Sequence, residues 1–265
     1  MPQLDKERIA ISFSKAAQSY DGSAAFQRDV GHHLLSMLAV DRSTVKVVDL
    51  GCGTGYFSEQ LLSKVSADSS IIGLDIAQGM LKYASDLRDD SRLQWLCSDA
   101  ENLALASSSI DLVFSSLAIQ WCEHPTKLFA EIKRVLKPGG VALLSSLGPN
   151  SLYELKAAWA NVDQHVHVNH FIAMDALLAA LPSELEVVKA QQQQWLLEYD
   201  QLKQLTADLK NIGAHNMNSG ESKGLTGRAK IMSFKQNYEL YRQDNGKLPA
   251  SYEVYFLKLC KAGTS

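Results

Sequence analysis

The sequence predicts an α/β fold built on a mostly parallel sheet of seven strands with helices on both faces. The first observation is that short apolar runs alternate with segments of helical periodicity from residue 45 onward, as βαβ units do. The second is that glycines close the first apolar run and that Lys137-Pro138-Gly139-Gly140 stops a later helix and turns the chain. The crossovers of successive βαβ units are expected to cover the sheet from both sides.

The elements follow one another along the chain in this alternation. The first five strands are expected at residues 45–50, 70–74, 92–97, 110–115 and 141–146. The helices between them are expected at residues 56–65, 79–87 and 126–136. The chain then returns with strands at residues 185–195 and 251–259, separated by helices near residues 202–210 and 229–241. Two stretches fall outside the alternation, since residues 5–40 and 151–181 both read as helical.

Composition and charge exclude several classes of protein. Hydrophobic residues make up 46% of the 265 and charged residues 21%, a globular balance that excludes wholesale disorder. The net charge of -3 does not suit nucleic acid as the main partner, and no apolar run approaches the roughly 20 residues that cross a bilayer. The N-terminal residues lack the apolar segment of a secretory signal, and the four cysteines have no paired spacing. We therefore expect a cytoplasmic protein without disulfides, a nucleic-acid partner or a membrane partner.

The motif VVDLGCGTGYF (residues 47–57) carries the first sign of a ligand site. A buried strand ends at Asp49, and Gly51, Gly53 and Gly55 then open a helix, where glycines let the chain turn sharply and a ligand lie against the backbone. The third glycine comes one residue too early for the dinucleotide fingerprint, and the lysine of a phosphate loop is missing. The carboxylate of Asp49 suits a ligand that carries an ammonium group.

Two further acidic residues stand at the ends of the next strands. Asp75 ends the second strand, 20 residues after Gly55, where a carboxylate can accept hydrogen bonds from both hydroxyls of a ribose. Asp99 follows the third strand, where it can accept from an adenine amino group. Because ligands of open α/β sheets bind at the carboxyl ends of the strands, the three carboxylates are expected along one edge.

These motifs resemble those of the class I S-adenosylmethionine (SAM) dependent methyltransferases. The matching segments, in order and spacing, are VVDLGCGTG, the pair Leu74–Asp75, SDAENL (residues 98–103) and LKPGG (residues 136–140). The resemblance implies a Rossmann-like methyltransferase fold and SAM as methyl donor, whereas a redox Rossmann domain is the weaker alternative. The cofactor-binding residues that it implies are Asp49, Gly51 and Gly53 for the methionine part, Asp75 for the ribose, Ile76, Met80, Asp99 and Ala100 for the adenine, Leu117 near the sulfonium, and Gln27 or Arg28 for the methionine carboxylate.

Segments outside these motifs resemble one family in particular, the malonyl-[acyl-carrier protein] O-methyltransferases of biotin synthesis. They are FSKAAQSYD (residues 13–21), FQR (26–28), LAIQWC (117–122), SLYELKAAWANVDQHVHVNHF (151–171), LKNIGAHN (209–216) and GLTGR (224–228). The resemblance implies methyl esterification of the free carboxylate of a malonyl group on an acidic acyl carrier protein, with malonyl-CoA as another acceptor. One departure concerns His170, where that family often has an arginine.

The implied reaction limits what the acceptor site must contain. A carboxylate is already ionised at pH 7, so it needs no general base, and what remains is to position the two reactants and exclude water. A cation should hold the carboxylate, and the candidates are Lys210, Arg228 and His170. Tyr20 could donate a hydrogen bond to the acceptor. Each of these side chains could also be an ordinary packing or solvated residue, and Trp121 suits a pocket wall.

A metal site is not expected. His165, His167 and His170 lie near Asp163 in the sequence. However, methyl transfer by direct displacement needs no metal, and no other part of the sequence supplies a set of metal ligands. His167 is expected to orient backbone or line the acceptor channel.

The same resemblance divides the single expected domain, residues 1–265, into four parts. These are an N-terminal helical cap (5–40), a SAM-binding core (45–147), a helical insertion forming an acceptor lid (151–181) and a C-terminal part of sheet and acceptor-facing helices (182–265). Residues 201–265 hold 10 basic and 5 acidic residues, which could meet an acidic partner or form solvated helix faces. Two other functions stay open: a methyltransferase acting on a quinone carbon or another small acid, and a non-catalytic SAM-binding module.

Overall fold

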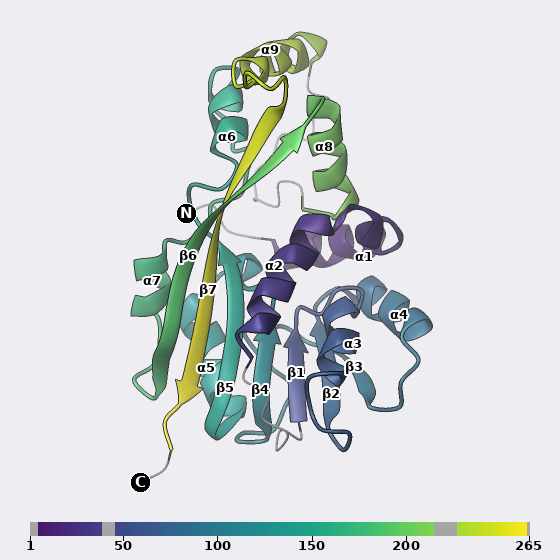
Figure 1. Cartoon of the computed structure of the whole chain (residues 1–265), viewed down its shortest axis with the longest axis vertical. Helices are drawn as coiled ribbons and strands as arrows, with labels where there is room; N and C mark the ends of the chain where they lie inside the picture. Colours follow the sequence, from purple (N-terminus) through teal and green to yellow (C-terminus); the bar gives the residue numbers. More distant parts are fainter. Residues whose placement is uncertain (1–4, 39–45, 215–226, 264–265) are drawn as a thin grey trace.

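A single seven-stranded sheet forms the centre of the computed structural model, which describes residues 5–38, 46–214 and 227–263 (Figure 1). The strands are β1 Lys46–Leu50, β2 Ser70–Asp75, β3 Leu93–Cys97, β4 Ile110–Ser115, β5 Leu136–Leu147, β6 Leu185–Tyr199 and β7 Leu248–Lys261. Their order across the sheet is β3-β2-β1-β4-β5-β7-β6, and only β7 runs antiparallel to its neighbours β5 and β6. The predicted mostly parallel sheet of seven strands is confirmed.

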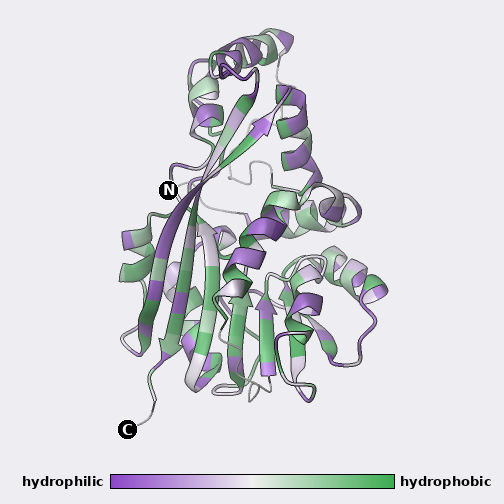
Figure 2. Cartoon of the chain, in the orientation of Figure 1, coloured by the Kyte–Doolittle hydropathy of each residue, from purple (hydrophilic) through white to green (hydrophobic). Residues whose placement is uncertain are grey.

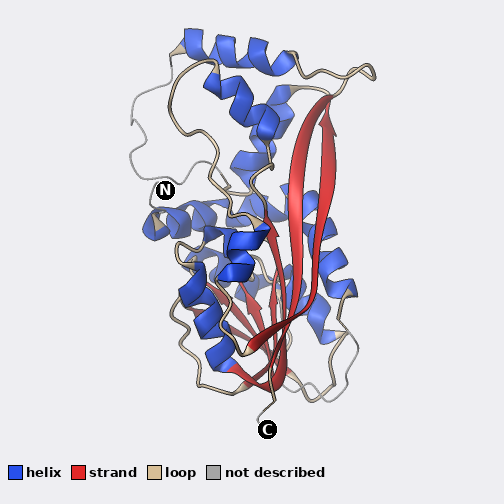
Figure 3. Cartoon of the chain, turned by 90° about the vertical axis from the view of Figure 1, so that its left-hand side faces the viewer, coloured by secondary structure: helices blue, strands red, loops and turns tan. Residues whose placement is uncertain are grey.

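The helices of the described part occupy the segments in which helical periodicity was found. They are α1 Lys6–Ser23, α2 Ala25–Ser36, α3 Tyr56–Leu62, α4 Gln78–Leu87, the 3-10 turn η1 Ile119–Trp121, α5 Pro125–Val135, α6 Tyr153–Ala160, α7 Met174–Ala179, α8 Leu202–Asn211 and α9 Arg228–Glu239. Figure 3 shows helices on both sides of the sheet when it is viewed along its edge. Both helical stretches outside the βαβ alternation are therefore confirmed.

Consecutive residues of each central strand point to opposite faces of the sheet, so each face has its own core. Val47 packs on one side with residues of α2, α3 and α6, whereas Val48 packs on the other with residues of α5 and α7. Both valines are fully buried, and burying a side chain of this size stabilises a fold by about 1.5–3 kcal/mol. Figure 2 shows the matching pattern, with hydrophobic colour along the central strands and hydrophilic colour over much of α9.

The predicted turn at residues 137–140 is instead part of β5. Ile110 pairs with Leu136 and Leu112 pairs with Val141, so the register shifts and extra residues bulge out of β5. Gly139 has φ +78°, a left-handed conformation that such an irregularity needs. Turn residues therefore mark a bulge within β5 here, and the strand begins earlier than predicted.

The two last strands extend well beyond the rest of the sheet. β7 pairs with β6 along its whole length but with β5 only over residues 254–260, and both strands are longer than predicted. The part of this antiparallel strand pair that extends beyond β5 packs against α6 and α8, and α9 packs on α6 in the same region (Figure 1). On the side of the molecule away from α6, α1 lies above the carboxyl ends of the central strands (Figure 1).

The topological switch point of the sheet lies between β1 and β4, because successive strands are added on one side of β1 up to β3 and on the other side from β4 onward. Ligands of open α/β sheets bind at such a switch point, outside the carboxyl ends of the strands. Within the described ranges, no helix has both the length and the apolar content that a membrane span requires.

Candidate functional site

The glycine turn after β1 adopts a conformation that favours glycine. Gly51 has φ +72° and Gly53 has φ +53°, both in the left-handed region. A Cβ atom on Gly51 would lie 2.2 Å from the Cβ of Ala118, so the turn packs directly against the segment after β4. A Cβ on Gly53 would meet no atom within 4 Å, so the backbone there borders open space. The turn is therefore built for close approach of a ligand.

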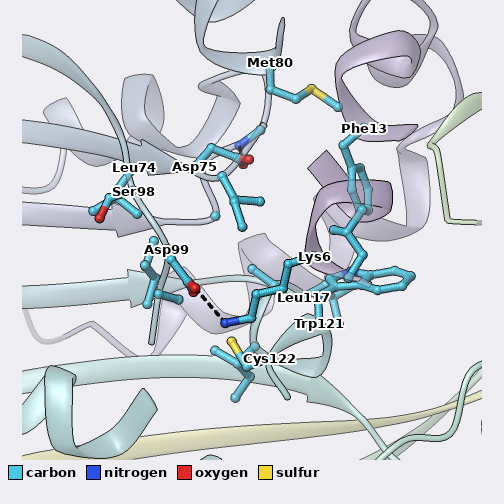
Figure 4. Close-up of a pocket in the computed structure, with 18 of the residues that line it drawn as sticks. Lys6, Phe13, Leu74, Asp75, Met80, Ser98, Asp99, Leu117, Trp121 and Cys122 are labelled. Carbon is cyan, nitrogen blue, oxygen red and sulfur yellow. Dashed lines mark hydrogen bonds and ion pairs between the residues drawn. The ribbon is translucent and has the colours of Figure 1, made fainter. Parts of the chain in front are cut away.

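A cavity of about 790 Å³ lies between this turn and α1. Its lining brings together most of the residues predicted to bind the cofactor, together with Tyr20 (Figure 4): Gly51, Gly53, Asp75, Ile76, Met80, Asp99, Ala100 and Leu117. From α1, Ile9 and Phe13 close the opposite side. We call this space the first cavity.

Asp75 is the central polar group of the first cavity. Its Oδ2 accepts a hydrogen bond from the Gly53 amide at 2.9 Å, and its Oδ1 accepts from the Ala77 amide at 2.7 Å. Burial raises the pKa of this carboxyl, while the backbone donors oppose that shift. A carboxylate has about four acceptor sites, so Asp75 retains acceptor capacity for a ligand beyond its backbone donors.

Asp49 lies beneath the glycine turn rather than in the cavity wall. It is 2% exposed, and its Oδ2 accepts from the Ser58 hydroxyl at 2.7 Å. Burial raises its pKa to about 7, and the hydrogen bond from Ser58 limits that rise. Asp49 is thus not among the residues that line the first cavity, and its contact with the methionine part stays a prediction.

Lys6 is a residue of the first cavity that the sequence reasoning missed. Its Nζ lies 2.6 Å from Oδ2 of Asp99 and 3.0 Å from Oε2 of Glu101, which ties the start of α1 to the sheet edge (Figure 4). No motif or spacing relates Lys6 to residues more than 90 positions away, so only the packing of α1 across the strand ends shows the contact.

A second cavity, of about 1040 Å³, adjoins the first. The two share four wall residues, Phe13, Tyr20, Leu117 and Trp121. Trp121 is thus the wall residue that the sequence suggested, and its ring meets Phe13 edge to face at 5.3 Å. Most of the remaining lining comes from α2, α8 and the inserted residues 151–181, with Lys210 and His167 among it, and η1, β5 and β7 each add a residue.

Tyr20 stands between the two cavities. Burial, followed by the charge of Asp75, raises the pKa of its hydroxyl well above the usual value. The hydroxyl is therefore protonated at neutral pH and can donate a hydrogen bond to a ligand in either cavity.

Of the three predicted cations, the structure brings Lys210 to the second cavity and leaves the other two outside it. His170 lines a third cavity, beside Lys156 and His165. Arg228 is exposed at the first residue of α9 and lines none of these three cavities. Sequence spacing could not separate the three candidates, because their positions depend on how α8, α9 and the inserted residues 151–181 pack on the rest of the fold. Part of the segment GLTGR (224–228), which contains Arg228, lies outside the described residues. The last two residues of LKNIGAHN (209–216) lie outside them as well.

Gln27 also lies in the second cavity and not in the first. It shares this lining with Leu117, predicted to lie near the sulfonium, and its contact with the methionine carboxylate stays a prediction. Its neighbour Arg28 donates from Nη1 to the Asp21 carbonyl at 2.7 Å and lies over the Tyr56 ring.

The histidines of the inserted segment belong to a network of ion pairs and stacked rings. Nε2 of His167 lies 2.7 Å from Oδ1 of Asp163, whose Oδ2 accepts from Lys230 at 2.9 Å. The His167 ring stacks on Trp159 at 3.8 Å, and Trp159 stacks on Phe234 of α9 at 4.2 Å. In the part of the chain that the structure describes, no group of three or more metal-ligating side chains comes together.

Comparisons with known proteins agree with this architecture. Residues 48–144 match the methyltransferase domain family. The chain is 42% identical over 265 residues to malonyl-[acyl-carrier protein] O-methyltransferase of Methylovorus sp. (strain MP688), covering 96% of this chain and 88% of that one. A solved S-adenosylmethionine dependent methyltransferase from Mesorhizobium loti shares the fold, with a TM-score of 0.51 at 20% identity over 85% of this chain and 95% of that one.

Some relatives are longer than this chain. The biotin biosynthesis bifunctional protein BioHC of Cellvibrio japonicus (strain Ueda107) is 46% identical over 259 residues, which are 97% of this chain but 51% of that protein. The chain thus spans about half the length of the first curated relatives that it matches. The match to the Methylovorus protein, by contrast, runs nearly end to end in both chains. The chain belongs to the malonyl-[acyl-carrier protein] O-methyltransferase family.

Proposed function

We propose that this protein transfers a methyl group from SAM to the free carboxylate of a malonyl thioester on an acyl carrier protein. The products would be the methyl ester of the malonyl-carrier protein and S-adenosylhomocysteine, at an early step of biotin synthesis. The observation that carries the proposal is the pair of adjoining cavities, one with the carboxylates of Asp75 and Asp99 at the strand ends and one with Lys210 in its wall. The names of the relatives supply the acceptor.

The first cavity fits the donor on two independent observations. Asp75 has acceptor capacity left for the ribose, and the backbone at Gly53 borders space that a side chain would fill. The sulfonium of the donor supplies an activated methyl carbon and a positive charge. In the proposal, Ile76 and Met80 flank the adenine, Asp99 and Ala100 take its edge, and Leu117 borders the reacting carbon.

The second cavity positions the nucleophile. Lys210 holds the malonyl carboxylate while one carboxylate oxygen stays free to attack the methyl carbon, and Tyr20 donates a hydrogen bond to the acceptor. A carbon–oxygen bond forms as the carbon–sulfur bond breaks, and its electron pair goes to sulfur. No proton moves and no metal is needed, since the carboxylate is ionised at neutral pH. The product ester is neutral, so Lys210 no longer holds it.

Acceptor identity is tested by incubating the protein with methyl-labelled SAM and, in parallel, malonyl-carrier protein, malonyl-CoA and a quinone. We expect label in a base-labile ester of the malonyl thioesters, with the carrier protein preferred. Label on the quinone, or no transfer to any acceptor, would refute the proposal.

The buried Asp49 makes SAM affinity depend on pH. Its pKa of about 7 means that the carboxyl is mostly protonated below pH 7, which removes a negative charge that favours the cationic ligand. The SAM dissociation constant should therefore rise about tenfold from pH 8 to pH 6, because affinity is lost as pH falls through that pKa. Calorimetry across this range measures it.

Asp49→Asn is the control for this pH dependence. The amino group of SAM titrates equally in both experiments, so the difference between the two profiles reports Asp49 alone. If wild type and Asp49→Asn show the same profile between pH 6 and 8, the carboxyl is not coupled to the cofactor.

The exposed basic side chains of α9 form the surface that we assign to the carrier protein. Arg228, Lys230 and Lys235 are exposed on α9, and stacking through Phe234, Trp159 and His167 connects this helix to the second cavity. An acidic carrier protein would be attracted to this surface.

The double variant Arg228→Glu/Lys235→Glu should lower kcat/KM for malonyl-carrier protein about tenfold at low salt, mostly through slower association. Turnover of malonyl-CoA, which needs no protein docking, should stay within about twofold. The matched control Lys82→Glu/Lys127→Glu makes the same charge change on α4 and α5, away from α9 (Figure 1). Equal losses in the two double variants would remove the assignment.

A further inference from the structure

The side chain of Gln120, on η1 between the two cavities, is held in one orientation. Its Nε2 donates a hydrogen bond to the Leu117 carbonyl at 2.6 Å, so the other end of the amide is the oxygen. That oxygen is buried and has no hydrogen-bond partner among the described residues, and the side chain lines the second cavity. Buried acceptors in folded proteins nearly always have a donor from the protein, an ordered water or a ligand, so this oxygen has capacity for a donor that the described residues do not supply.

A second such oxygen belongs to another residue that lines the same cavity. Oε1 of Gln27, on α2, is likewise buried without a partner in the described ranges. The two amides come from segments more than 90 residues apart, yet both border the space that Lys210 also borders. Two residues that line the second cavity thus carry a buried amide oxygen without a partner in the described ranges, in addition to the cation of Lys210.

The malonyl group cannot satisfy these two oxygens. Its carboxylate and its thioester carry only acceptors, which an amide oxygen repels. The pantetheine arm that carries an acyl group on a carrier protein has two secondary amide N–H groups, joined by apolar segments. Much of the rest of the cavity wall is apolar, with Phe26, Leu155 and Phe171 among its residues.

We propose that Gln120 and Gln27 accept hydrogen bonds from the amide N–H groups of the pantetheine arm. The second cavity then selects its substrate by the arm as well as by the malonyl carboxylate that Lys210 holds. This inference rests on the proposed function, because it assigns the remaining polar groups of the same acceptor site.

The test compares three small malonyl thioesters that differ in the number of amides: malonyl-pantetheine with two, malonyl-N-acetylcysteamine with one, and malonyl ethyl thioester with none. For wild type we expect kcat/KM to rise at least about tenfold from the ethyl thioester to the pantetheine thioester, because a site built for an N–H donor rejects an analogue that lacks it. In Gln120→Met this preference should shrink about tenfold, and in Gln27→Met it should also shrink.

The preference is a ratio between substrates, so any loss common to all of them, such as a shift of Leu117, cancels. Gln236→Met, an exposed position on α9, is the matched control and should keep the wild-type preference. If Gln120→Met does not fold, the preference measured with Gln27→Met, on α2, tests the inference instead. An unchanged preference in the folded variants overturns the inference. Absence of methyl ester from all three thioesters and from malonyl-carrier protein would instead overturn the proposed function, so the two failures are distinguishable.

Discussion

Replacing Lys210 with alanine is expected to lower kcat/KM for malonyl-carrier protein at least about 30-fold, while SAM affinity stays within about twofold. Lys210 is exposed in the ligand-free chain, and a loss of this size is expected where the malonyl group buries the charge pair on binding, because the remaining charge then has no counterpart. Lys210 lines the second cavity but not the first, so the cofactor should not sense the change. Steady-state kinetics and calorimetry with SAM measure the two quantities.

Two further variants serve as a control and a rescue for the Lys210→Ala experiment. Lys203→Ala removes an exposed lysine from the same helix and should leave turnover unchanged. Lys210→Arg keeps the charge and should recover part of the lost activity. Normal methylation by Lys210→Ala would show that another group holds the carboxylate.

Replacing Asp75 with alanine is expected to weaken SAM binding at least tenfold. The carboxylate is held by the amides of Gly53 and Ala77 with its remaining acceptor capacity facing the first cavity. A hydrogen bond to a charged group contributes about 1.5–3 kcal/mol, which corresponds to roughly ten- to 150-fold in affinity. Calorimetric titration with SAM measures the dissociation constant directly.

The control for Asp75 is Asp86→Ala, which removes an exposed carboxylate from α4 with no contact to the cavity lining. SAM affinity in this control should equal that of wild type. Unchanged affinity in Asp75→Ala would contradict the ribose assignment, whereas an unfolded variant would be recognised by circular dichroism before titration.

Much of the fold follows from local features of the sequence. Apolar runs bounded by glycine or proline predicted the strands, and β4 begins and ends at the predicted residues. The run at residues 137–140 was misleading because the same residue types serve a turn and a bulge, and only pairing with β4 distinguishes them. The length of β6 and β7 depends on how the two strands pair with each other, which local composition does not report.

The two cavities differ in how far the sequence could describe them. The first is formed at strand ends, where motif order alone places Gly53, Asp75 and Asp99 together. The second is assembled from α1, α2, α8 and the inserted helices, whose packing no local pattern specifies. This is why Gln120 was missed, and why Lys210 could not be separated from Arg228 and His170 before the structure was known. Lys6 of the first cavity was missed because only the packing of α1 across the strand ends brings it there.

The most direct measurement is a crystal structure of the protein with S-adenosylhomocysteine and a malonyl-pantetheine thioester. The account predicts adenosine in the first cavity with its ribose hydroxyls on Asp75, and the malonyl carboxylate in the second against Lys210. One carboxylate oxygen should face the sulfur directly where the two cavities meet, beside Tyr20 and Leu117. A malonyl group bound with no cationic side chain beside its carboxylate, or turned away from the sulfur, would contradict it.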